Sequence, residues 1–223
     1  MGSPRPIEFE YVRCINDSKG HVHNIHSHDV YDVCYDCNMG VPEYVMHHLT
    51  SDEAINSERA DNRTDDFRMC PVVTNIEGSI SAMNGDYRKS GYDKGHMCPN
   101  NDRDYNAKSA SQTFMMCNMA PQLHVVNAGL WKKTEELGHK YAEKYGEVVI
   151  VSGPIFYKDK PIVKLKDRVS VPHAFFKVFY ANDACIDGYI IPNDKSEIKG
   201  RKGLNPFKAD VSTIEACTNV DLR

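Results

Sequence analysis

The spacing of apolar residues predicts strands in the first part of the chain. Apolar runs of a few residues are separated by polar, turn-forming residues, as in a hairpin or meander. The runs lie at residues 8–14, 30–35 and 42–49, with a turn at 36–40. Residues 50–66 are polar and charged, so we expect a surface loop there.

The central part of the chain predicts a strand, a polar loop and a second strand. Tyr92–Cys98 and Thr113–Met119 are the two strand candidates, and residues 100–112 form the loop between them. Proline cannot donate a hydrogen bond to a sheet ladder, so we expect Pro99 and Pro121 to end the strands that precede them.

After the second strand the period changes to that of a helix. From Asn127 to Tyr145 apolar residues recur every three or four positions, and Gly146 is a typical helix stop. Later segments predict three strands and a short helix, at residues 147–151, 171–180, 188–191 and 211–217. This order of elements indicates an α+β fold with a mainly antiparallel sheet.

Length and composition indicate one soluble domain that covers residues 1–223. The chain has 223 residues, of which 41% are hydrophobic. No apolar run approaches the roughly eighteen residues that span a bilayer, so we expect no membrane segment. The N-terminus lacks the apolar core of a signal peptide. A secreted or periplasmic location is favoured if a natural leader has been removed.

The net charge of −4 argues against a protein that coats nucleic acid by electrostatics alone. Two basic clusters could still flank a groove for a polyanion, or could be solvated loop faces. They consist of Lys158, Lys160, Lys164, Lys166 and Arg168, and of Lys195, Lys199, Arg201 and Lys202.

The eight cysteines permit disulfides if the protein is exported, although the sequence does not give their pairing. Cys98 and Cys117 have apolar neighbours, and small buried thiols are at least as expected there as bonded ones. A structural zinc near residues 21–37 is a further hypothesis, because histidine and cysteine are the ligands that Zn²⁺ prefers. Its candidate ligands are His21, His23, His26, His28, Cys34 and Cys37, and their spacing fits no zinc motif we know.

The most informative residues lie between Asp93 and Glu135. Cleaving a phosphodiester with water requires a base, a cation and a means of holding the phosphate. His96 is the candidate base, because imidazole is largely neutral near pH 7. Asn127 offers an amide oxygen, a hard ligand suited to Mg²⁺. Glu135, eight residues further along the predicted helix, can orient metal-bound water.

These residues resemble the DNA/RNA non-specific endonucleases of the ββα-metal (His-Me finger) type. That family has Asp-Arg-Gly-His after a strand, then Ser-Asn-x-x-Pro-Gln, then Asn-x-Gly-x-Trp and a glutamate on the helix. This chain has Asp93-Lys94-Gly95-His96, Cys117-Asn118-Met119-Ala120-Pro121-Gln122, Asn127-Ala128-Gly129-Leu130-Trp131 and Glu135. The resemblance places a central ββα-metal unit at about residues 88–146.

The resemblance also implies roles for the matching residues. It implies His96 as general base, Asn127 as direct metal ligand and Glu135 as a ligand through water. Asn118 and Asp93 would organise the site. Arg63 is the best match for a phosphate-binding arginine, with Arg59 and Arg68 as alternatives. Lys94 replaces the motif arginine, so positive charge is kept and bidentate contact is lost.

The predicted function is therefore a Mg²⁺-dependent endonuclease that cuts DNA and RNA without strong sequence specificity, with Mn²⁺ as a possible substitute. Because water is the nucleophile, no 2′-hydroxyl is needed, and products should carry 5′-phosphate ends. A homodimer is possible. The alternatives are a decayed module that binds nucleic acid or zinc, and a site-specific nuclease of the His-Asn-His type. Taken alone, His96 would be a buried histidine, Asn127 a helix N-cap, Trp131 a core residue and Glu135 a solvent-facing residue.

Overall fold

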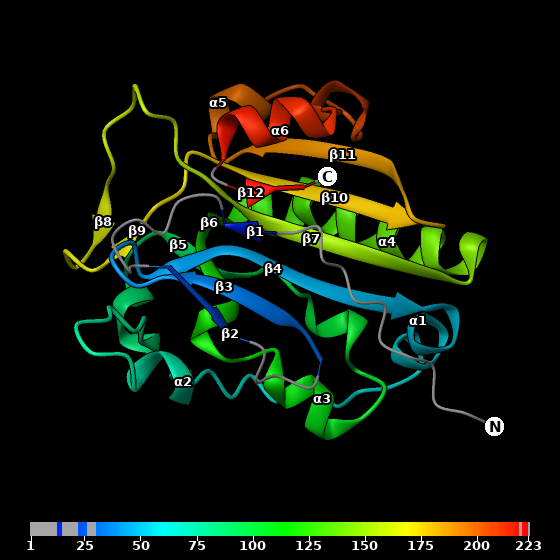
Figure 1. Ribbon diagram of the computed structural model, residues 1–223, viewed down its shortest axis with the longest axis horizontal. Coiled ribbons are helices and arrows are strands. Elements are labelled where there is room, and N and C mark those ends of the chain that lie inside the picture. Colours follow the sequence, from blue (N-terminus) through cyan, green and yellow to red (C-terminus); the bar gives the residue numbers. More distant parts are fainter. Residues whose placement is uncertain (1–12, 15–21, 26–29, 219, 223) are drawn as a thin grey trace.

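A six-stranded antiparallel sheet lies at the centre of the computed structural model, which describes residues 13–14, 22–25, 30–218 and 220–222 (Figure 1). In spatial order the strands are β11-β10-β7-β4-β3-β2. They comprise β2 (Val22–Ile25), β3 (Asp32–Asp36), β4 (Val41–Thr50), β7 (Glu147–Ile155), β10 (Ala174–Ala181) and β11 (Ala184–Pro192). The predicted α+β class and mainly antiparallel sheet are confirmed.

Strand β10 is buried on both faces, which explains its nearly continuous run of apolar residues. Phe175 and Phe179 pack in one core cluster with Trp131, whereas Phe176 and Val178 pack in a second cluster with Ile214. The first face is covered by α4 (Lys132–Tyr145) and the second by α6 (Val211–Cys217) (Figure 1). Two cores on opposite faces make this sheet the rigid support for the elements that carry the site.

The strand-strand-helix unit packs on the α4 side of the sheet. It consists of β5 (Tyr92–His96), β6 (Met119–Leu123) and a π-helical turn, η4 (Val126–Trp131), that continues into α4. In the β5–β6 ladder, a Cβ on Gly95 would lie 2.1 Å from Oε1 of Gln122, so any larger residue would collide with this buried side chain. The motif glycine is thus required by close packing between the two strands.

Shorter elements complete the described chain. Two further strand pairs are β1 (Arg13–Cys14) with β12 (Val220–Asp221) and β8 (Lys164–Leu165) with β9 (Val169–Ser170). The remaining helical segments are α1 (Ser51–Glu58), α2 (Pro71–Thr74), η1 (Asn84–Tyr87), η2 (Asn100–Asp102), α3 (Ala107–Gln112), η3 (Met116–Asn118), α5 (Lys195–Ile198) and η5 (Asn205–Phe207). No helix of the described residues is long and apolar enough to cross a membrane.

The prediction of a loop over residues 50–66 was wrong in its first half. Thr50 and Glu53 form a reciprocal capping box, in which each side chain accepts a hydrogen bond from the backbone of the other, and helix α1 follows. Only the part from Arg59 onward is a loop. It carries Arg63, as expected.

The second strand of the central unit was also placed wrongly. Residues 113–119, predicted as a strand, contain the short helix η3, and the strand β6 begins only at Met119. Pro121 does not end it but lies within it, opposite Lys94. A two-stranded ladder tolerates proline because each strand has one unpaired edge. The loop predicted at residues 100–112 contains η2 and α3, and Asn106 caps α3.

The other predicted elements are confirmed with shifted ends. The expected strands at 30–35, 42–49, 147–151, 171–180 and 188–191 correspond to β3, β4, β7, β10 and β11, and the short helix at 211–217 is α6. Most of the strand expected at 8–14 lies outside the described residues.

Candidate active site

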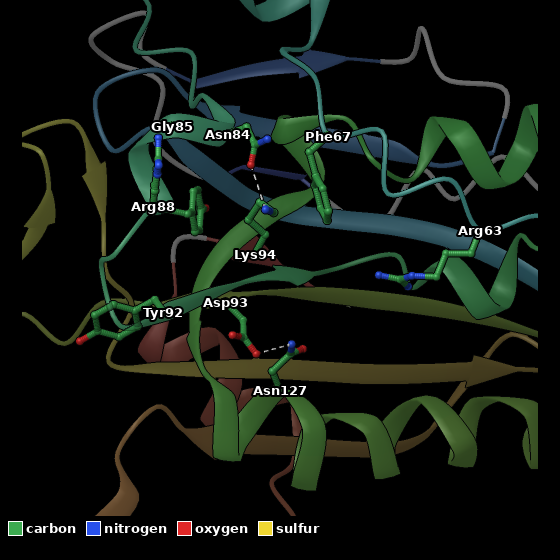
Figure 2. Close-up of a pocket in the computed structure, with 10 residues that line it drawn as sticks. Arg63, Phe67, Asn84, Gly85, Arg88, Tyr92, Asp93, Lys94 and Asn127 are labelled. Atoms are coloured by element: carbon green, nitrogen blue, oxygen red, sulfur yellow. Dashed lines mark hydrogen bonds between the residues drawn. The ribbon is translucent and has the colours of Figure 1, made fainter.

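An open cleft of about 630 Å³ lies over β5 and the start of the long helix. Its walls combine charged, amide and aromatic side chains, several of which are drawn in Figure 2. The lining residues are Arg63, Phe67, Asn84, Gly85, Tyr87, Arg88, Tyr92, Asp93, Lys94 and Asn127. Four residues that the sequence singled out, Arg63, Asp93, Lys94 and Asn127, are therefore brought together in one cleft.

His96 ends β5 and lies against the aromatic residues at the edge of this cleft. Its ring centroid is 5.9 Å from that of Phe67, which lines the cleft, and 5.2 Å from that of Phe114. Its Nε2 atom is buried and has no hydrogen-bond partner. Desolvation, followed by the positive charge of Arg63, lowers the pKa of His96 to about 3. The imidazole is therefore neutral over a wide pH range, with a nitrogen free to accept a proton.

Two hydrogen bonds join the β5 strand to the helix. The indole nitrogen of Trp131 donates to the backbone oxygen of His96 at 3.0 Å, and Nδ2 of Asn127 donates to Oδ2 of Asp93 at 3.0 Å (Figure 2). Trp131 is fully buried, as expected for a core residue, and it also fixes the backbone that carries the candidate base. His96 and Asn127 thus come from elements that are held side by side.

Asn127 lies inside the π-helical turn and is not a helix N-cap. The turn begins at Val126, and the cap residue before it, Val125, makes no side-chain capping hydrogen bond. The side-chain nitrogen of Asn127 is committed to Asp93, which leaves its amide oxygen as the available acceptor. A π-turn also changes the rotation per residue, so Asn127 and Glu135 are not related as they would be on a regular α-helix.

Glu135 is half-buried, so its side chain does not lie on the solvent-facing side of α4. Desolvation raises its pKa to about 7, and the positive charge of Lys177 opposes that shift. Lys177 is buried on β10, with Nζ 4.3 Å from the centroid of the Trp131 ring. The interpretation of Glu135 as an ordinary exposed helix residue is therefore wrong.

A buried ion-pair network lies beneath this part of α4. Oδ2 of Asp102 is 2.8 Å from Nε2 of His47, and Oδ1 of Asp102 is 2.9 Å from Nε2 of His139. Arg103 extends the network to Glu53, with 3.3 Å between Nη1 and Oε2. The network links β4, the loop after β5, α1 and α4, and it holds the helix that carries Glu135 in place.

Asn118 organises the site from below and does not line the cleft. It is fully buried, its Oδ1 accepts from the backbone nitrogen of Cys98, and its Nδ2 donates to the backbone oxygens of Cys98 and Thr113. The two bonds to Cys98 fix the chain just after His96. This geometry supports the expected organising role and gives Asn118 no direct part in the chemistry.

Arg63 and Lys94 are two of the three cations that line the cleft. Arg63 is about half exposed and pairs with Asp65 at 2.6 Å. Nζ of Lys94 bonds Oδ1 of Asn84 at 2.9 Å and lies 4.0 Å from the centroid of the Phe67 ring. The alternatives Arg59 and Arg68 are absent from the cleft walls, and Arg68 pairs with Asp66. Of the three candidate arginines, Arg63 is the one placed to meet a phosphate.

The zinc hypothesis receives no support from the described residues. Outside the described residues lie His21, His26 and His28, and the side chain of His23 is not described either. Cys34 is disulfide-bonded and so cannot bind zinc as a thiolate. Within the described ranges no group of three or more His, Cys, Asp or Glu side chains could hold a metal ion. Cys98 and Cys117 are buried thiols that form no disulfide, one of the two states considered above.

Sequence reasoning missed several residues of the cleft. Asn84, Arg88 and Tyr92 line it, although none belongs to the motif that drew attention to β5. Tyr92 could have been found, because it lies two residues before Lys94 and alternate residues of a strand share a face. Asn84 lies in η1 and Arg88 directly follows it, and tertiary packing, which the sequence does not reveal, brings both into the cleft.

The donor set fits a hard divalent cation bound through few protein ligands. Asn127 presents an amide oxygen in the cleft, and Glu135 is a carboxylate on the helix that follows, whose pKa is raised by desolvation against the opposing positive charge of Lys177. Magnesium typically keeps several of its waters and accepts one or two protein oxygens, so a site without a three-residue ligand cluster is suited to it.

Comparisons with known proteins agree with this geometry. The family model described as DNA/RNA non-specific endonuclease matches residues 12–223. A crystal structure of an EndoG/EndoGI complex, described as showing the mechanism of EndoG inhibition, matches with a TM-score of 0.77 and 27% sequence identity. That match covers 90% of this chain and 84% of the other.

Several curated proteins are similar over most of this chain. Mitochondrial nuclease of Saccharomyces cerevisiae is 26% identical over 91% of this chain and 66% of its own length. The mitochondrial nuclease EXOG of Danio rerio is 31% identical over 81% of this chain and 55% of its own length. A nuclease of Nostoc sp. is 29% identical over 86% of this chain and 70% of its own length. The chain thus spans between about half and two thirds of the length of the first two relatives.

Proposed function

This chain belongs to the DNA/RNA non-specific endonuclease family, a family of metal-dependent nucleases, and on that premise we propose that it hydrolyses phosphodiester bonds of DNA and RNA. The observation that carries the proposal is the buried, unpartnered Nε2 of His96 beside a cleft that also holds Arg63, Lys94 and Asn127. A base, two cations and a hard oxygen ligand are the parts that such a reaction needs.

In the proposed reaction His96 acts on water. Its neutral Nε2 accepts a proton from the water whose oxygen attacks phosphorus, and the bond from phosphorus to the 3′ oxygen breaks. The leaving oxygen takes a proton from solvent, so the products carry 5′-phosphate and 3′-hydroxyl ends. The imidazole is uncharged before the proton is transferred, and its buried Nε2 has no other hydrogen-bond partner.

The other cleft residues hold the substrate and the metal. Arg63 and Lys94 contact the phosphate oxygens, and Asp93 orients the amide of Asn127 through the bond already described. Asn127 would hold the metal directly and Glu135 through water, with Asn118 fixing the chain after His96. The proposed ion is Mg²⁺, with Mn²⁺ able to substitute. When bound, it supplies positive charge against the charge that develops on the phosphate.

The decisive test compares unmodified protein with His96→Ala on plasmid DNA and on RNA, with and without EDTA. We expect the unmodified protein to degrade both substrates to a smear and EDTA to stop it. His96→Ala should be inactive while keeping its circular dichroism spectrum. Undiminished cleavage by His96→Ala would overturn the assignment of the base, and 2′,3′-cyclic phosphates from RNA would overturn the water mechanism.

The same digest separates the alternative functions. A protein that leaves plasmid and RNA intact with Mg²⁺ would be a decayed binding module, and discrete fragments would indicate a site-specific nuclease. The family membership and the intact set of His96, Asn127 and Glu135 favour the non-specific enzyme.

Three further expectations belong to the same proposal. The relatives include proteins named as mitochondrial nucleases and a bacterial nuclease, and the disulfide at Cys34 is typical of an oxidising compartment. If a natural leader has been removed, we propose secretion or the periplasm, which fractionation of the source cells would test. A homodimer and a single domain over residues 1–223 also stay predictions, tested by sedimentation and by limited proteolysis.

A further inference from the structure

The cleft extends beyond the residues that the proposed reaction uses. Figure 2 shows Arg63 on one side of Asp93 and Lys94, and Arg88 and Tyr92 on the other. Asn84 and Gly85 of η1 close this second end. The proposed reaction uses the Arg63 end, where His96 lies beside Phe67 and Phe114, and the residues next to it, so the end that carries Arg88 and Tyr92 has no assigned role.

The cleft as a whole is positively charged, in a chain whose net charge is −4. The charged lining residues are Arg63, Arg88 and Lys94 against Asp93, whose Oδ2 already accepts hydrogen bonds from Asn127 and His124. Arg88 is exposed, so its guanidinium is available to a ligand. Concentrating cations in one cleft of an acidic protein is expected for a site that receives a polyanion.

One of the two basic clusters noted in the sequence contributes to this end. Nζ of Lys166 donates to the backbone oxygen of Gly85 at 2.5 Å, and Nη2 of Arg168 donates to that of Ser81 at 2.8 Å. Arg168 also faces Asp86, with 3.6 Å between Nε and Oδ2. The β8–β9 hairpin therefore packs its cations against the segment that contains η1, and Lys166 extends positive charge past the rim of the cleft.

Tyr92 supplies an aromatic surface at a regular distance from the reacting centre. Tyr92, Lys94 and His96 are alternate residues of β5 and so share one side of the strand, in steps of about 6.8 Å. This step is close to the spacing of neighbouring phosphates along an extended nucleic-acid strand. Tyr92 is half-buried, which leaves part of its ring open to the cleft.

We propose that Arg88 and Tyr92 form a subsite for the nucleotide next to the scissile phosphate, in which Arg88 contacts its phosphate and Tyr92 stacks on its base. The inference rests on the proposed function. Stacking is independent of base identity, so such a subsite strengthens binding without adding sequence specificity. It requires an unstacked base, so it favours single strands over duplex.

The test measures binding without cleavage. A fluorescent single-stranded DNA 12-mer and the matching duplex are titrated with the His96→Ala protein in EDTA, by anisotropy at several salt concentrations. Tyr92→Leu, which keeps apolar bulk, Tyr92→Phe and Arg88→Ala are each added to that background. Lys140→Ala removes an exposed cation of α4 outside the cleft and is the matched control.

We expect Tyr92→Leu to weaken single-strand binding by about fivefold to a hundredfold, the range for losing one stacked base. The effect on duplex should be smaller, and Tyr92→Phe should restore affinity. Arg88→Ala should make the salt dependence of single-strand binding shallower by about 0.7 in the logarithmic slope. Lys140→Ala should leave affinity and slope unchanged. Melting curves check that each variant is folded.

Unchanged affinity in both Tyr92→Leu and Arg88→Ala would overturn the subsite, as would equal losses for duplex and single strand. Absence of single-strand binding by the His96→Ala protein at low salt would overturn it as well. The proposed function fails separately, when unmodified protein with Mg²⁺ leaves plasmid and RNA intact. If the unmodified protein cuts plasmid and RNA, and every variant binds the 12-mer equally well, the proposed function holds and only the subsite is wrong.

Discussion

Two regions of the molecule use histidine in opposite ways. At the end of β5, the Nε2 atom of His96 is buried without a partner, and desolvation together with the charge of Arg63 lowers its pKa to about 3. Beneath α4, His139 bonds one oxygen of Asp102 at 2.9 Å, and Asp102 and Glu58 keep the pKa of His139 above its usual value despite burial. The imidazole of His96 has a nitrogen without a partner, and we call its surroundings the open region. The imidazole of His139 is held in an ion pair, and we call that network the supporting region.

This difference indicates that His96 serves the reaction and that the Asp102 network serves the stability of the fold. A buried polar atom without a partner costs free energy, so its presence needs a reason, and a ligand or substrate that supplies the missing partner is one. A carboxylate that accepts from two imidazoles is fully used and has no capacity for substrate. His96 is therefore expected to matter for activity and little for stability, and Asp102 the reverse.

The largest expected effect is the loss of activity in His96→Ala. A general base contributes about 10²-fold to 10⁴-fold to a reaction rate, so kcat should fall by that factor. The free energy of unfolding should change by less than about 2 kcal/mol, because the imidazole packs mainly against the rings of Phe67 and Phe114. His173→Ala is the control, because His173 lies before β10 against Tyr157 and contacts neither His96 nor the rings around it. More than a tenth of the original kcat in His96→Ala would break the comparison.

The next effect is on stability. Asp102→Ala leaves His47 and His139 without their shared acceptor, and removing one member of a buried ion pair costs about 3–5 kcal/mol. Urea denaturation should show a lower free energy of unfolding by that amount. Asp210→Ala removes an exposed carboxylate that caps α6 and should cost about 1 kcal/mol. A cost for Asp102→Ala no larger than that of Asp210→Ala would show that the network does not support the fold.

The sequence predicted the open region better than the supporting one. The residues from Asp93 to Asn127 could be recognised by their types and order, and the structure places Asp93, Lys94 and Asn127 in one cleft together with Arg63. The ion-pair network joins Asp102 to residues 55 and 37 positions away, and a polar loop gives no sign of such burial.

The local misplacements have different causes. The signature of Thr50 and Glu53 was readable and would have predicted α1. The π-turn at Asn127 was not readable, since a period of 3.6 residues cannot reveal a locally wider turn. Pro121 was misplaced because its effect depends on whether the strand has a free edge, which only the assembled sheet decides.

A smaller effect should appear when stability is measured against pH. His96 has a folded pKa lowered from the ordinary 6.5 to about 3, so the unfolded chain binds this proton first as pH falls. Its contribution is fully present above pH 6.5 and is lost as pH decreases toward 3. His139, with a raised pKa, has the opposite sign: its contribution is present below pH 6.5 and is lost as pH rises through the raised value.

His96→Gln isolates the contribution of the open histidine. Between pH 7 and pH 5 the unmodified protein should lose about 1 kcal/mol more of its free energy of unfolding than His96→Gln does, since the residue keeps some exposure and the full slope of about 1.4 kcal/mol per pH unit is not reached. Urea denaturation at both pH values measures the difference. Equal losses in the two proteins would mean that His96 lies in a water-like environment.

The smallest effect is expected from Lys94→Arg, which changes the geometry of a cation and keeps its charge. Lys94 holds Asn84 at 2.9 Å and lies 4.0 Å from the Phe67 ring centroid, and arginine can make both contacts. Its planar fork adds the possibility of two parallel hydrogen bonds to phosphate. We therefore expect kcat/KM on plasmid DNA to stay the same or to rise by a few-fold. Lys94→Gln, which removes the charge, should lower it by at least about tenfold. A large loss of kcat/KM in Lys94→Arg would mean that the contacts of Lys94 with Phe67 and Asn84 require a lysine. The open region would then be more tightly packed than the unpartnered nitrogen of His96 indicates.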